Sequence, residues 1–578
     1  MSQILDQRKF YIDGAWVAPA QARDLEVIDP STEEAVAVIS LGGQADTDAA
    51  VAAAKRAFPA WAATPPAERL AVVERILEVY ERRMPDIARA ISLEMGAPQD
   101  MSRADQAEAG AWHTRNFITA FKEFQFVRPL GDHAPTSMVA WEPVGVVGLI
   151  TPWNWPMNQV TLKVIPALLA GDTCVLKPSE IAPLSSMVFA EVLHEAGVPA
   201  GVFNLVNGDG AGVGSQLSVH PDVEMISFTG STRAGIAISK AAADSLKKVV
   251  LELGGKGANI VFADADDKAV VRGARHCFYN TGQSCNAPTR MLVERSVYDR
   301  AVEVAARVAE ETAVATAHQP GRHIGPVVSR AQWDKIQGLI QAGIDEGARL
   351  VAGGTGLPEG VNRGYFVRPT VFADVSNDMT VAQQEIFGPV LSIIPFDSEE
   401  EAVAIANDTP YGLTNYVQSQ DGARRNRVAR QLRSGMVEMN GESRGAGSAF
   451  GGVKKSGRAR EGGVMGLEEF MDSKAISGWD RAAIPAVVPN LSEPAPGGLP
   501  VPPDPPAGTS RQPRRGMGPV PIRHGARGGC PRGHRPRRER WPPRWGPAFA
   551  ATARRAEGAV GSGLWPGCGD QAISARKM

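Results

Sequence analysis

Cysteine is scarce in this chain: five cysteines occur among 578 residues, and no two of them form a Cys-x-x-Cys pair. This usage excludes a disulfide framework and is typical of a reducing compartment, so we expect a cytoplasmic protein. The first residues lack the apolar core of a signal peptide, and no run approaches the roughly 18 apolar residues of a membrane span. With 43% hydrophobic and 21% charged residues, the sequence predicts soluble globular domains.

Apolar side chains become scarce after Asp480. Residues 481–578 contain 18 Pro and 15 Gly but only 12 Ile, Leu, Val and Phe together. They carry 16 Lys and Arg against five Asp and Glu, a net charge of +11, which leaves −13 on residues 1–480. Too few apolar residues are present to build a core, so this segment is predicted to be a disordered basic tail rich in Pro, Gly and Arg.

Two interpretations of the tail stay open. Its arginines could bind nucleic acid or another acidic surface, or the tail could be GC-rich sequence translated beyond a shifted or lost stop codon. Cys530 and His534 lack a second pair of ligands at metal spacing, so we predict no metal site. Apart from the tail, nothing suggests nucleic acid as a partner.

Residues 144–254 alternate regularly between apolar runs and helical stretches. This alternation predicts parallel βαβ units with a sheet covered on both faces. A second α/β segment is predicted from Asn259 to about Asn440, followed by a Gly-rich loop over 441–463. The predicted strands are 144–150, 173–176, 202–206, 224–228 and 248–253, and the helices between them are 158–169, 184–196, 212–219 and 231–243.

Two residues in these segments have side chains suited to carbonyl chemistry. Cys285 follows the turn Thr281-Gly282-Gln283-Ser284, and a thiol is a nucleophile that adds to carbonyl carbon. Glu252 lies in an apolar strand, where burial raises the pKa of a carboxyl group and prepares it to take a proton from water. Each also has a plainer interpretation, because a single Cys is usually a small buried apolar residue and a Glu at a strand end is usually solvated.

Further polar residues follow the predicted strands. Asn154 lies in a turn bounded by two prolines, Lys177 and Glu180 flank Pro178, and Ser231 opens a helix after a glycine turn. Open α/β sheets bind ligands at the carboxyl edge, and the N–H groups at a helix start favour a phosphate. Each motif alone is equally compatible with a structural turn.

Taken in order, these motifs resemble the NAD(P)-dependent aldehyde dehydrogenase superfamily over residues 8–478; they are PWNWP, LKPSE, FTGSTRAG, LELGGK, GQSC, EIFGPV and FGGVKKSG. The resemblance implies an α/β fold with a Rossmann-like parallel-sheet cofactor domain, an α/β catalytic domain and a small β oligomerisation arm. It also implies a homodimer or homotetramer, with residues 124–138 and 468–476 as candidate interface strands. The implied boundaries are 1–122 and 144–254 for the cofactor domain, 255–448 for the catalytic domain, 123–143 and 465–480 for the arm, and 481–578 for the tail.

The resemblance also implies a reaction. Cys285 would add to an aldehyde to form a thiohemiacetal, whose oxyanion is stabilised by the Asn154 amide and the Cys285 backbone N–H. Hydride transfer to the nicotinamide of NAD⁺ would leave a thioester, which water activated by Glu252 hydrolyses to the free carboxylic acid. Members that transfer the acyl group to coenzyme A lack a Glu in this position. A thiol acyl hydrolase without hydride transfer, or a non-catalytic relative, is the alternative.

The cofactor residues follow from the same resemblance. Glu180 beside the adenine ribose would repel a 2′-phosphate, so NAD⁺ is preferred over NADP⁺, which stays possible. Lys177 and Glu180 would hold the adenine ribose, Ser231 the pyrophosphate, Glu385 the nicotinamide ribose and Phe387 the nicotinamide face; further cofactor-binding residues are Ile150, Trp153, Ser179, Gly208, Gly214, Phe228, Gly230 and Leu253.

The substrate pocket is less well specified. Ala449 and Ala459 stand where the family usually has Pro and Gly, and the stretch after Asn440 lacks the aromatic residues that often surround apolar aldehydes. Together with Asn158 and Gln159, this composition predicts a polar pocket in which Arg444 meets a carboxylate of the substrate.

If the tail is translated GC-rich sequence beyond the natural stop, the native protein contains no peptide beyond Asp480. Tryptic mass spectrometry of protein isolated from its source tests this, and any peptide from residues 481–578 would contradict it. Salt-sensitive retention on DNA that is lost on truncation after Asp480 would instead support nucleic-acid binding by the tail.

Overall fold

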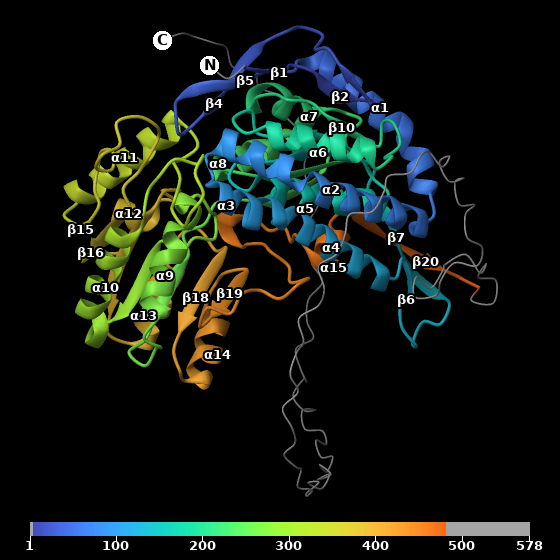
Figure 1. The fold of residues 1–578 in the computed structure, drawn as a ribbon. Coiled ribbons are helices and arrows are strands. Elements are labelled where there is room, and N and C mark those ends of the chain that lie inside the picture. The colour runs from blue at the N-terminus through green and yellow to red at the C-terminus, as the bar shows by residue number, and fades with distance from the viewer. Residues whose placement is uncertain (1–3, 481–578) are drawn as a thin grey trace, which may run out of the picture. The chain divides into compact units, whose positions relative to one another are not determined.

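The computed structural model describes residues 4–480 (Figure 1), and the predictions of disorder and of no metal site at Cys530 and His534 lie outside these residues. The described part contains two seven-stranded and two three-stranded sheets. The strands are β1 (Leu5–Gln7), β2 (Phe10–Ile12), β3 (Ala15–Val17), β4 (Asp24–Asp29), β5 (Glu34–Ser40), β6 (Val127–Pro129), β7 (Ser137–Pro143), β8 (Val146–Ile150), β9 (Thr173–Lys177), β10 (Phe203–Leu205), β11 (Met225–Thr229), β12 (Lys248–Glu252), β13 (Ala258–Val261), β14 (Arg290–Glu294), β15 (Arg349–Ala352), β16 (Thr370–Ala373), β17 (Val390–Phe396), β18 (Thr414–Gln418), β19 (Met436–Met439) and β20 (Met471–Ser477).

Helices surround the large sheets. The α-helices are α1 (Gln44–Ala63), α2 (Pro66–Met95), α3 (Gln99–Met101), α4 (Glu108–Glu123), α5 (Pro156–Ala170), α6 (Leu184–Glu195), α7 (Ser215–Val219), α8 (Thr232–Ala243), α9 (Ala269–Phe278), α10 (Tyr298–Glu311), α11 (Arg330–Asp345), α12 (Thr380–Gln383), α13 (Glu399–Asn407), α14 (Gly422–Gln431) and α15 (Gly463–Glu468). Two π-helical turns, η1 (Ser102–Ala107) and η2 (Gly210–Gly214), and three 3₁₀ turns, η3 (Tyr279–Gly282), η4 (Arg295–Val297) and η5 (Lys454–Ser456), complete the set.

Proline and glycine bound the two long helices near the first sheet. Helix α2 begins at Pro66 and ends at Gly96, whose φ is +79°, and helix α5 begins at Pro156 and ends at Gly171, whose φ is +103°. Proline has the helical φ and lacks an N–H that would go unpaired in the first turn, whereas glycine adopts the left-handed cap without strain.

The first large sheet has the order β12-β11-β8-β9-β10-β2-β3, and its first five strands are parallel. Alternate residues of a strand enter opposite cores: in β8, Val147 and Leu149 join the core under α2, α4, α5 and α6, whereas Val146 and Ile150 join the core under α1, α7 and α8. The predicted parallel sheet with both faces covered is therefore confirmed.

The second large sheet has the order β15-β16-β17-β14-β13-β18-β19, in which only β15 is antiparallel. Leu292 of β14 packs with residues of α11 to α14, and its neighbours Met291 and Val293 pack with residues of α9 and α10. This sheet and its helices occupy the yellow-green and orange side of Figure 1.

Two predicted segments differ from the structure in detail. The predicted helix over 212–219 is divided into η2 and α7, because Asp209 accepts a hydrogen bond from the Gly212 N–H and closes a wider first turn. In the predicted interface segments, strand structure is confined to β6, β7 and β20, and residues 463–468 form helix α15 because Leu467 is drawn into the core.

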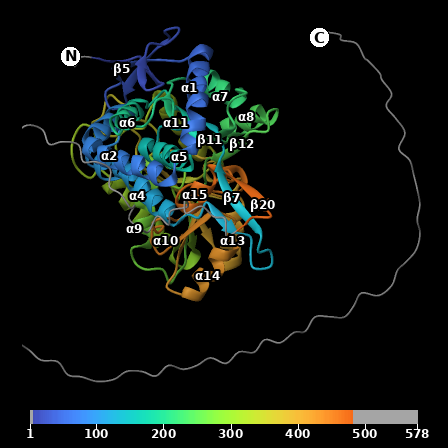
Figure 2. The same ribbon diagram turned by 90° about the vertical axis from the view of Figure 1, so that its right-hand side faces the viewer.

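Strands β6, β7 and β20 form a separate antiparallel sheet. Strand β20 pairs with β7 along its whole length, from Met471 opposite Pro143 to Ser477 opposite Ser137. Figure 2 shows β7 and β20 lying side by side and projecting together. The sheet joins the two segments that sequence analysis assigned to an oligomerisation arm, and that role stays a prediction.

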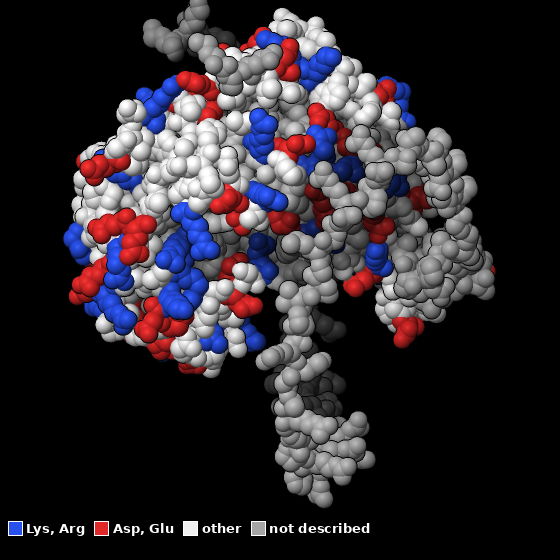
Figure 3. Space-filling model, viewed as in Figure 1, with Lys and Arg blue, Asp and Glu red and all other residues white. Residues whose placement is uncertain are grey.

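Acidic and basic side chains are intermixed on the surface face drawn in Figure 3. The net negative charge of residues 1–480 is thus not gathered into one acidic patch on that face. Within residues 4–480, no helix combines the length and apolar character needed to span a bilayer.

Close backbone contacts hold the Cys285 loop against two neighbouring segments. A Cβ atom added to Gly282 would lie 2.1 Å from the Gly388 carbonyl oxygen, and one added to Gly255 would lie 2.2 Å from the Cys285 carbonyl oxygen. No side chain fits at either position, so the loop that carries Cys285 lies directly on the backbone of its neighbours.

Gly282→Ala tests this contact against Gly197→Ala. Both glycines have a left-handed φ, +72° and +77°, but nothing lies within 4 Å of a Cβ added to Gly197. We expect Gly197→Ala to cost about 1–2 kcal/mol of unfolding free energy from backbone strain alone. Gly282→Ala adds a backbone clash and should cost ~3 kcal/mol or more. Guanidinium-induced unfolding measures the loss of unfolding free energy in both variants. Equal losses would show that the backbone around Gly282 moves to accommodate the added methyl group.

Candidate active site

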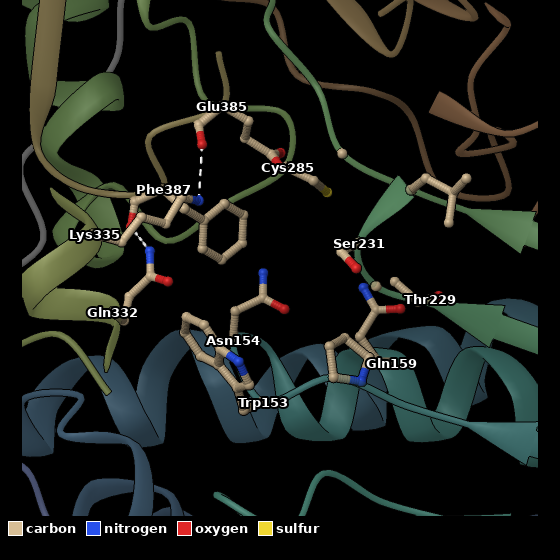
Figure 4. A pocket seen from close by; sticks show the side chains of 14 residues that line it. Trp153, Asn154, Gln159, Thr229, Ser231, Cys285, Gln332, Lys335, Glu385 and Phe387 are labelled. Atoms are coloured by element: carbon tan, nitrogen blue, oxygen red, sulfur yellow. Dashed lines mark hydrogen bonds between the residues drawn. The ribbon is translucent and has the colours of Figure 1, made fainter. Parts of the chain in front are cut away.

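A cleft of about 200 Å³ lies where the carboxyl edge of the first sheet meets the Cys285 loop. Figure 4 shows Asn154 and Trp153 on one side of it, Ser231 and Thr229 on another, and Cys285, Glu385 and Phe387 opposite. The residues that line it are Pro152, Trp153, Asn154, Gln159, Thr229, Gly230, Ser231, Leu253, Gly254, Cys285, Gln332, Lys335, Glu385 and Phe387.

The predicted site residues come from the edge of the first sheet and from two loops that precede strands of the second sheet, and not all of them reach the cleft wall. Eight of them line it: Trp153, Asn154, Gly230, Ser231, Leu253, Cys285, Glu385 and Phe387. The others lie at the ends of the strands or in the turns that follow, outside the wall: Ile150 on β8, Lys177, Ser179 and Glu180 after β9, Gly208 and Gly214 after β10, Phe228 on β11 and Glu252 on β12.

Cys285 is partly exposed, and both of its neighbours are held in place. The Trp155 indole N–H donates to Ser284 Oγ at 2.9 Å, and the Tyr416 hydroxyl donates to the Asn286 carbonyl at 2.7 Å. Burial, followed by the negative charges of Glu385, Glu252 and Glu461, raises the pKa of the Cys285 thiol well above its ordinary value. The thiol is therefore protonated at neutral pH in the cofactor-free protein.

Asn154 presents a carboxamide to the same cleft as the thiol. Its Nδ2 donates to the Gln283 carbonyl at 3.0 Å. A carboxamide nitrogen carries two N–H donors, so a second N–H is left for an oxygen atom in the cleft. This arrangement suits an oxyanion that develops on a carbonyl attacked by Cys285.

Glu252 lies behind the cleft wall and is only 2% exposed. Neither carboxylate oxygen has a hydrogen-bond partner among the described residues. Burial, and then the charge of Glu461, raise its pKa well above the ordinary value, although Lys163 opposes the shift. A buried carboxyl group of this kind is a strong base once ionised.

A buried ion pair lies beside Glu252. Lys163 and Glu461 are in contact, and both side chains are almost fully buried. The Lys163 ammonium also donates to Thr229 Oγ1 at 2.7 Å, and Thr229 lines the cleft. Thr229 on the cleft wall is thus connected through Lys163 to Glu461 in the interior, next to Glu252.

The start of helix α8 supplies the features of a phosphate site. Ser231 is its N-cap, with Oγ accepting from the Ala234 N–H at 3.3 Å, and Gly230 and Ser231 line the cleft. The first N–H groups of a helix and its dipole favour an anion. At the end of β9, Lys177 Nζ donates to Glu180 at 3.0 Å, which leaves the Glu180 carboxylate partly exposed.

Glu385 and Phe387 form the opposite wall. The Glu385 carboxylate accepts a hydrogen bond from the Gly255 N–H at 2.8 Å, and burial raises its pKa. Phe387 has a left-handed backbone, with φ at +63°, and its ring meets that of Trp153 edge-on at 5.4 Å. Two cleft walls from distant parts of the chain are thereby joined by an aromatic contact.

Sequence analysis missed Gln332 and Lys335. The Gln332 amide donates to the Phe387 carbonyl at 3.0 Å, and the Lys335 ammonium donates to the Glu385 carbonyl at 2.9 Å (Figure 4). Both lie one turn apart on α11, more than forty residues before the loop they hold. An ordinary amphipathic helix carries no local signal for this contact.

The residues of the predicted polar pocket lie in different places, and the pocket itself stays a prediction. Gln159 lines the cleft, and Asn158 Oδ1 accepts a hydrogen bond from His113 Nε2 at 2.7 Å. Arg444 is not on the cleft wall: it pairs with Glu438 at 3.4 Å and covers the Phe450 ring at 4.8 Å. A substrate carboxylate would have to compete with Glu438 for this guanidinium.

Comparison with known proteins identifies relatives of the described part. The model of the aldehyde dehydrogenase family matches residues 16–476. A 3-succinoylsemialdehyde-pyridine dehydrogenase from a Pseudomonas species is 49% identical over 477 residues, covering 82% of this chain and 99% of that protein. The crystal structure of an aldehyde dehydrogenase from Bartonella henselae is 65% identical, with a TM-score of 0.82, and is matched over 82% of this chain and 100% of its own. Aldehyde dehydrogenase C from Pseudomonas syringae, solved as a cysteine-to-alanine mutant with NAD⁺ and octanal, is 47% identical, with a TM-score of 0.80 and coverage of 82% and 98%.

The raised pKa of Cys285 predicts how its alkylation depends on pH. Because the thiolate is the reactive form, the rate with iodoacetamide in cofactor-free protein should rise about tenfold per pH unit from pH 7 to 9. Peptide mass spectrometry isolates the Cys285 adduct from those of other cysteines. A rate that stops rising below pH 8 would contradict the raised pKa of Cys285. Glu385→Gln should accelerate the reaction at pH 8, because among the neighbouring charges Glu385 raises the Cys285 pKa most.

Proposed function

Because the chain belongs to the aldehyde dehydrogenase family, we propose that it oxidises an aldehyde to the free carboxylic acid with NAD⁺ as the hydride acceptor. One observation carries the proposal: a thiol, an amide donor and a helix N-terminus share one cleft, with a buried carboxylate behind it. NAD⁺ complexes of relatives, such as the enzyme from Pseudomonas syringae, support this choice of cofactor.

Cys285 acts first in the proposed reaction. The thiol proton passes to water, the sulfur adds to the aldehyde carbon as the C=O double bond opens, and the resulting oxyanion accepts hydrogen bonds from the free N–H of Asn154 and the backbone N–H of Cys285. Donors of this kind are worth about 2.7–4 kcal/mol each in the transition state. They act without rearrangement, because the Gln283 carbonyl already orients the Asn154 amide.

The dinucleotide fits the residues along the sheet edge. The N–H groups at the start of α8 suit its pyrophosphate, the Lys177–Glu180 pair suits a ribose, and Glu385 suits the second ribose beside Phe387. Bound NAD⁺ supplies the acceptor for the hydride of the thiohemiacetal. The partly exposed Glu180 carboxylate would repel a 2′-phosphate, which favours NAD⁺ over NADP⁺.

Glu252 acts second, on the thioester that remains on Cys285. Its unpartnered, buried carboxylate has no competing hydrogen bond to lose when it takes a proton from water. Lys163 and Glu461 lie beside it and offer a route by which that proton leaves the site. Hydrolysis then returns Cys285 as a free thiol and releases the acid.

The small sheet of β6, β7 and β20 is proposed as the oligomerisation arm of a homodimer or homotetramer. Four consecutive residues of β20, from Asp472 to Ala475, are exposed. An exposed edge strand with unpaired N–H and C=O groups is a template for pairing with a second chain. This supports assembly through the arm that sequence analysis placed at 123–143 and 465–480.

Glu252→Gln separates hydride transfer from hydrolysis. Glutamine keeps the shape of the side chain but takes no proton from water, so we expect one NADH per active site in a rapid burst, followed by a stall as the thioester accumulates. Stopped-flow absorbance at the NADH band measures the burst, and mass spectrometry identifies the acyl group on Cys285. Steady turnover by this variant would remove Glu252 from the role, and acid formed without NADH would favour a thiol acyl hydrolase.

A further inference from the structure

A cluster of four buried carboxamides lies beneath the cleft, and of these only Asn154 is part of the cleft wall. Asn154, Gln283, Asn280 and Gln106 are each at most 4% exposed. Their hydrogen bonds connect three distant segments: the π-helical turn η1 before α4, the turn after β8, and the loop η3 that leads to Cys285.

Asn280 bridges two of these segments. Its Nδ2 donates to the Asn154 carbonyl at 3.0 Å and to the Gln283 carbonyl at 3.2 Å. The Gln283 carbonyl is also the acceptor for the Asn154 side chain. One amide nitrogen thus holds both the main chain of Asn154 and the oxygen atom that orients the Asn154 carboxamide.

Gln106 holds the same pair from the third segment. Its Nε2 donates to the Asn154 carbonyl at 3.2 Å and to Asn280 Oδ1 at 3.3 Å. Its own Oε1 has no hydrogen-bond partner among residues 4–480. Gln106 therefore acts through its N–H donors alone, and it lies in a π-helical turn, a helix irregularity that is frequent at functional sites.

The backbone at Asn280 has an unfavourable conformation that these bonds stabilise. Asn280 and Thr281 are both left-handed, with φ at +51° and +57°. Such residues cost about 1–3 kcal/mol each and persist only where the surroundings hold them. Asparagine tolerates the conformation better than most residues, and it supplies the N–H groups that the two carbonyls require.

We propose that Asn280 and Gln106 are positioning residues that hold the Asn154 amide against the Cys285 loop, so that its free N–H meets the reacting oxygen. The proposal rests on the oxyanion role assigned to Asn154 in the proposed function. Neither residue touches the substrate. Loss of either lets the Asn154 amide shift, and misplacement by about 1 Å at such a site costs on the order of 100-fold in rate.

The test is a double-mutant cycle in the Glu252→Gln enzyme, in which hydrolysis of the thioester is blocked, and it is read by the rate of the NADH burst at saturating aldehyde and NAD⁺. Gln106→Met and Asn280→Ala are made alone and in an Asn154→Ala background. We expect Gln106→Met to slow the burst about tenfold or more in the parent enzyme and to have little further effect once Asn154 is alanine. The burst amplitude and the dissociation constant of NAD⁺ should stay unchanged, which a general loss of structure would not allow.

Asn204→Ala is the matched control. Asn204 is also a buried asparagine whose Nδ2 bridges two carbonyls, those of Cys174 and Gly201, but it lies on β10 away from the cleft. This variant should lower the melting temperature and leave the burst rate intact. Since Gln106→Met keeps the size of the side chain and the backbone of the loop, it carries the test if Asn280→Ala does not fold.

The outcomes separate the two proposals. If Asn154→Ala alone leaves the burst rate unchanged, the oxyanion role fails and the positioning role fails with it. If Asn154→Ala slows the burst but Gln106→Met does not, or slows it by the same factor in both backgrounds, the positioning role alone is overturned. A slowed burst for Asn204→Ala as large as that for Gln106→Met would also overturn it.

Discussion

Direct contact between backbones, without intervening side chains, is the constraint on which the site depends. The Cys285 carbonyl lies where a side chain on Gly255 would be, and the Gly388 carbonyl lies where one on Gly282 would be. Gly255 follows β12 of the first sheet, Gly282 lies in η3, and Gly388 lies in the loop before β17. These glycines let three chain segments converge until the Cys285 thiol, the Asn154 amide and the Glu385 carboxylate line one cleft of about 200 Å³.

Burial has a chemical consequence at this junction. Glu252, Glu385 and Cys285 are all acids in a poorly solvated setting, and burial raises the pKa of each one. Each negative charge also disfavours ionisation of the thiol. The cofactor-free protein thus keeps Cys285 protonated. A charge that forms on Glu252 is favoured by Lys163 and disfavoured by its buried partner Glu461. A cationic nicotinamide ring would act on the thiol in the opposite direction.

The outer parts of the site are held by residues that do no chemistry. Gln332 and Lys335 hold the loop of Glu385 and Phe387 through main-chain carbonyls, and the carboxamides beneath Asn154 do the same for the other wall. In both cases the acceptor is a backbone oxygen, so the loop position is determined without constraining the side chain that faces the cleft. These hydrogen bonds hold the main chain of each loop from the side away from the cleft, so the side chains that face the cleft stay available for ligands.

The sequence by itself determined the parallel sheet, the order of the motifs, the family and the identity of the thiol, amide and carboxylate, because each depends on local features: strand periodicity, proline and glycine at turns, and a functional group at a strand end. Only the tertiary structure decided which of these residues face the cleft, that Glu252 lies behind its wall, and that Gln106, Asn280, Lys163, Gln332 and Lys335 form hydrogen bonds around it. Those five are ordinary polar residues within helices or a loop, and nothing in their neighbours along the chain distinguishes them from residues in any solvated turn. Their roles come from hydrogen bonds and ion pairs to segments up to about 300 residues away, and a contact of that kind exists only after the sheets have packed.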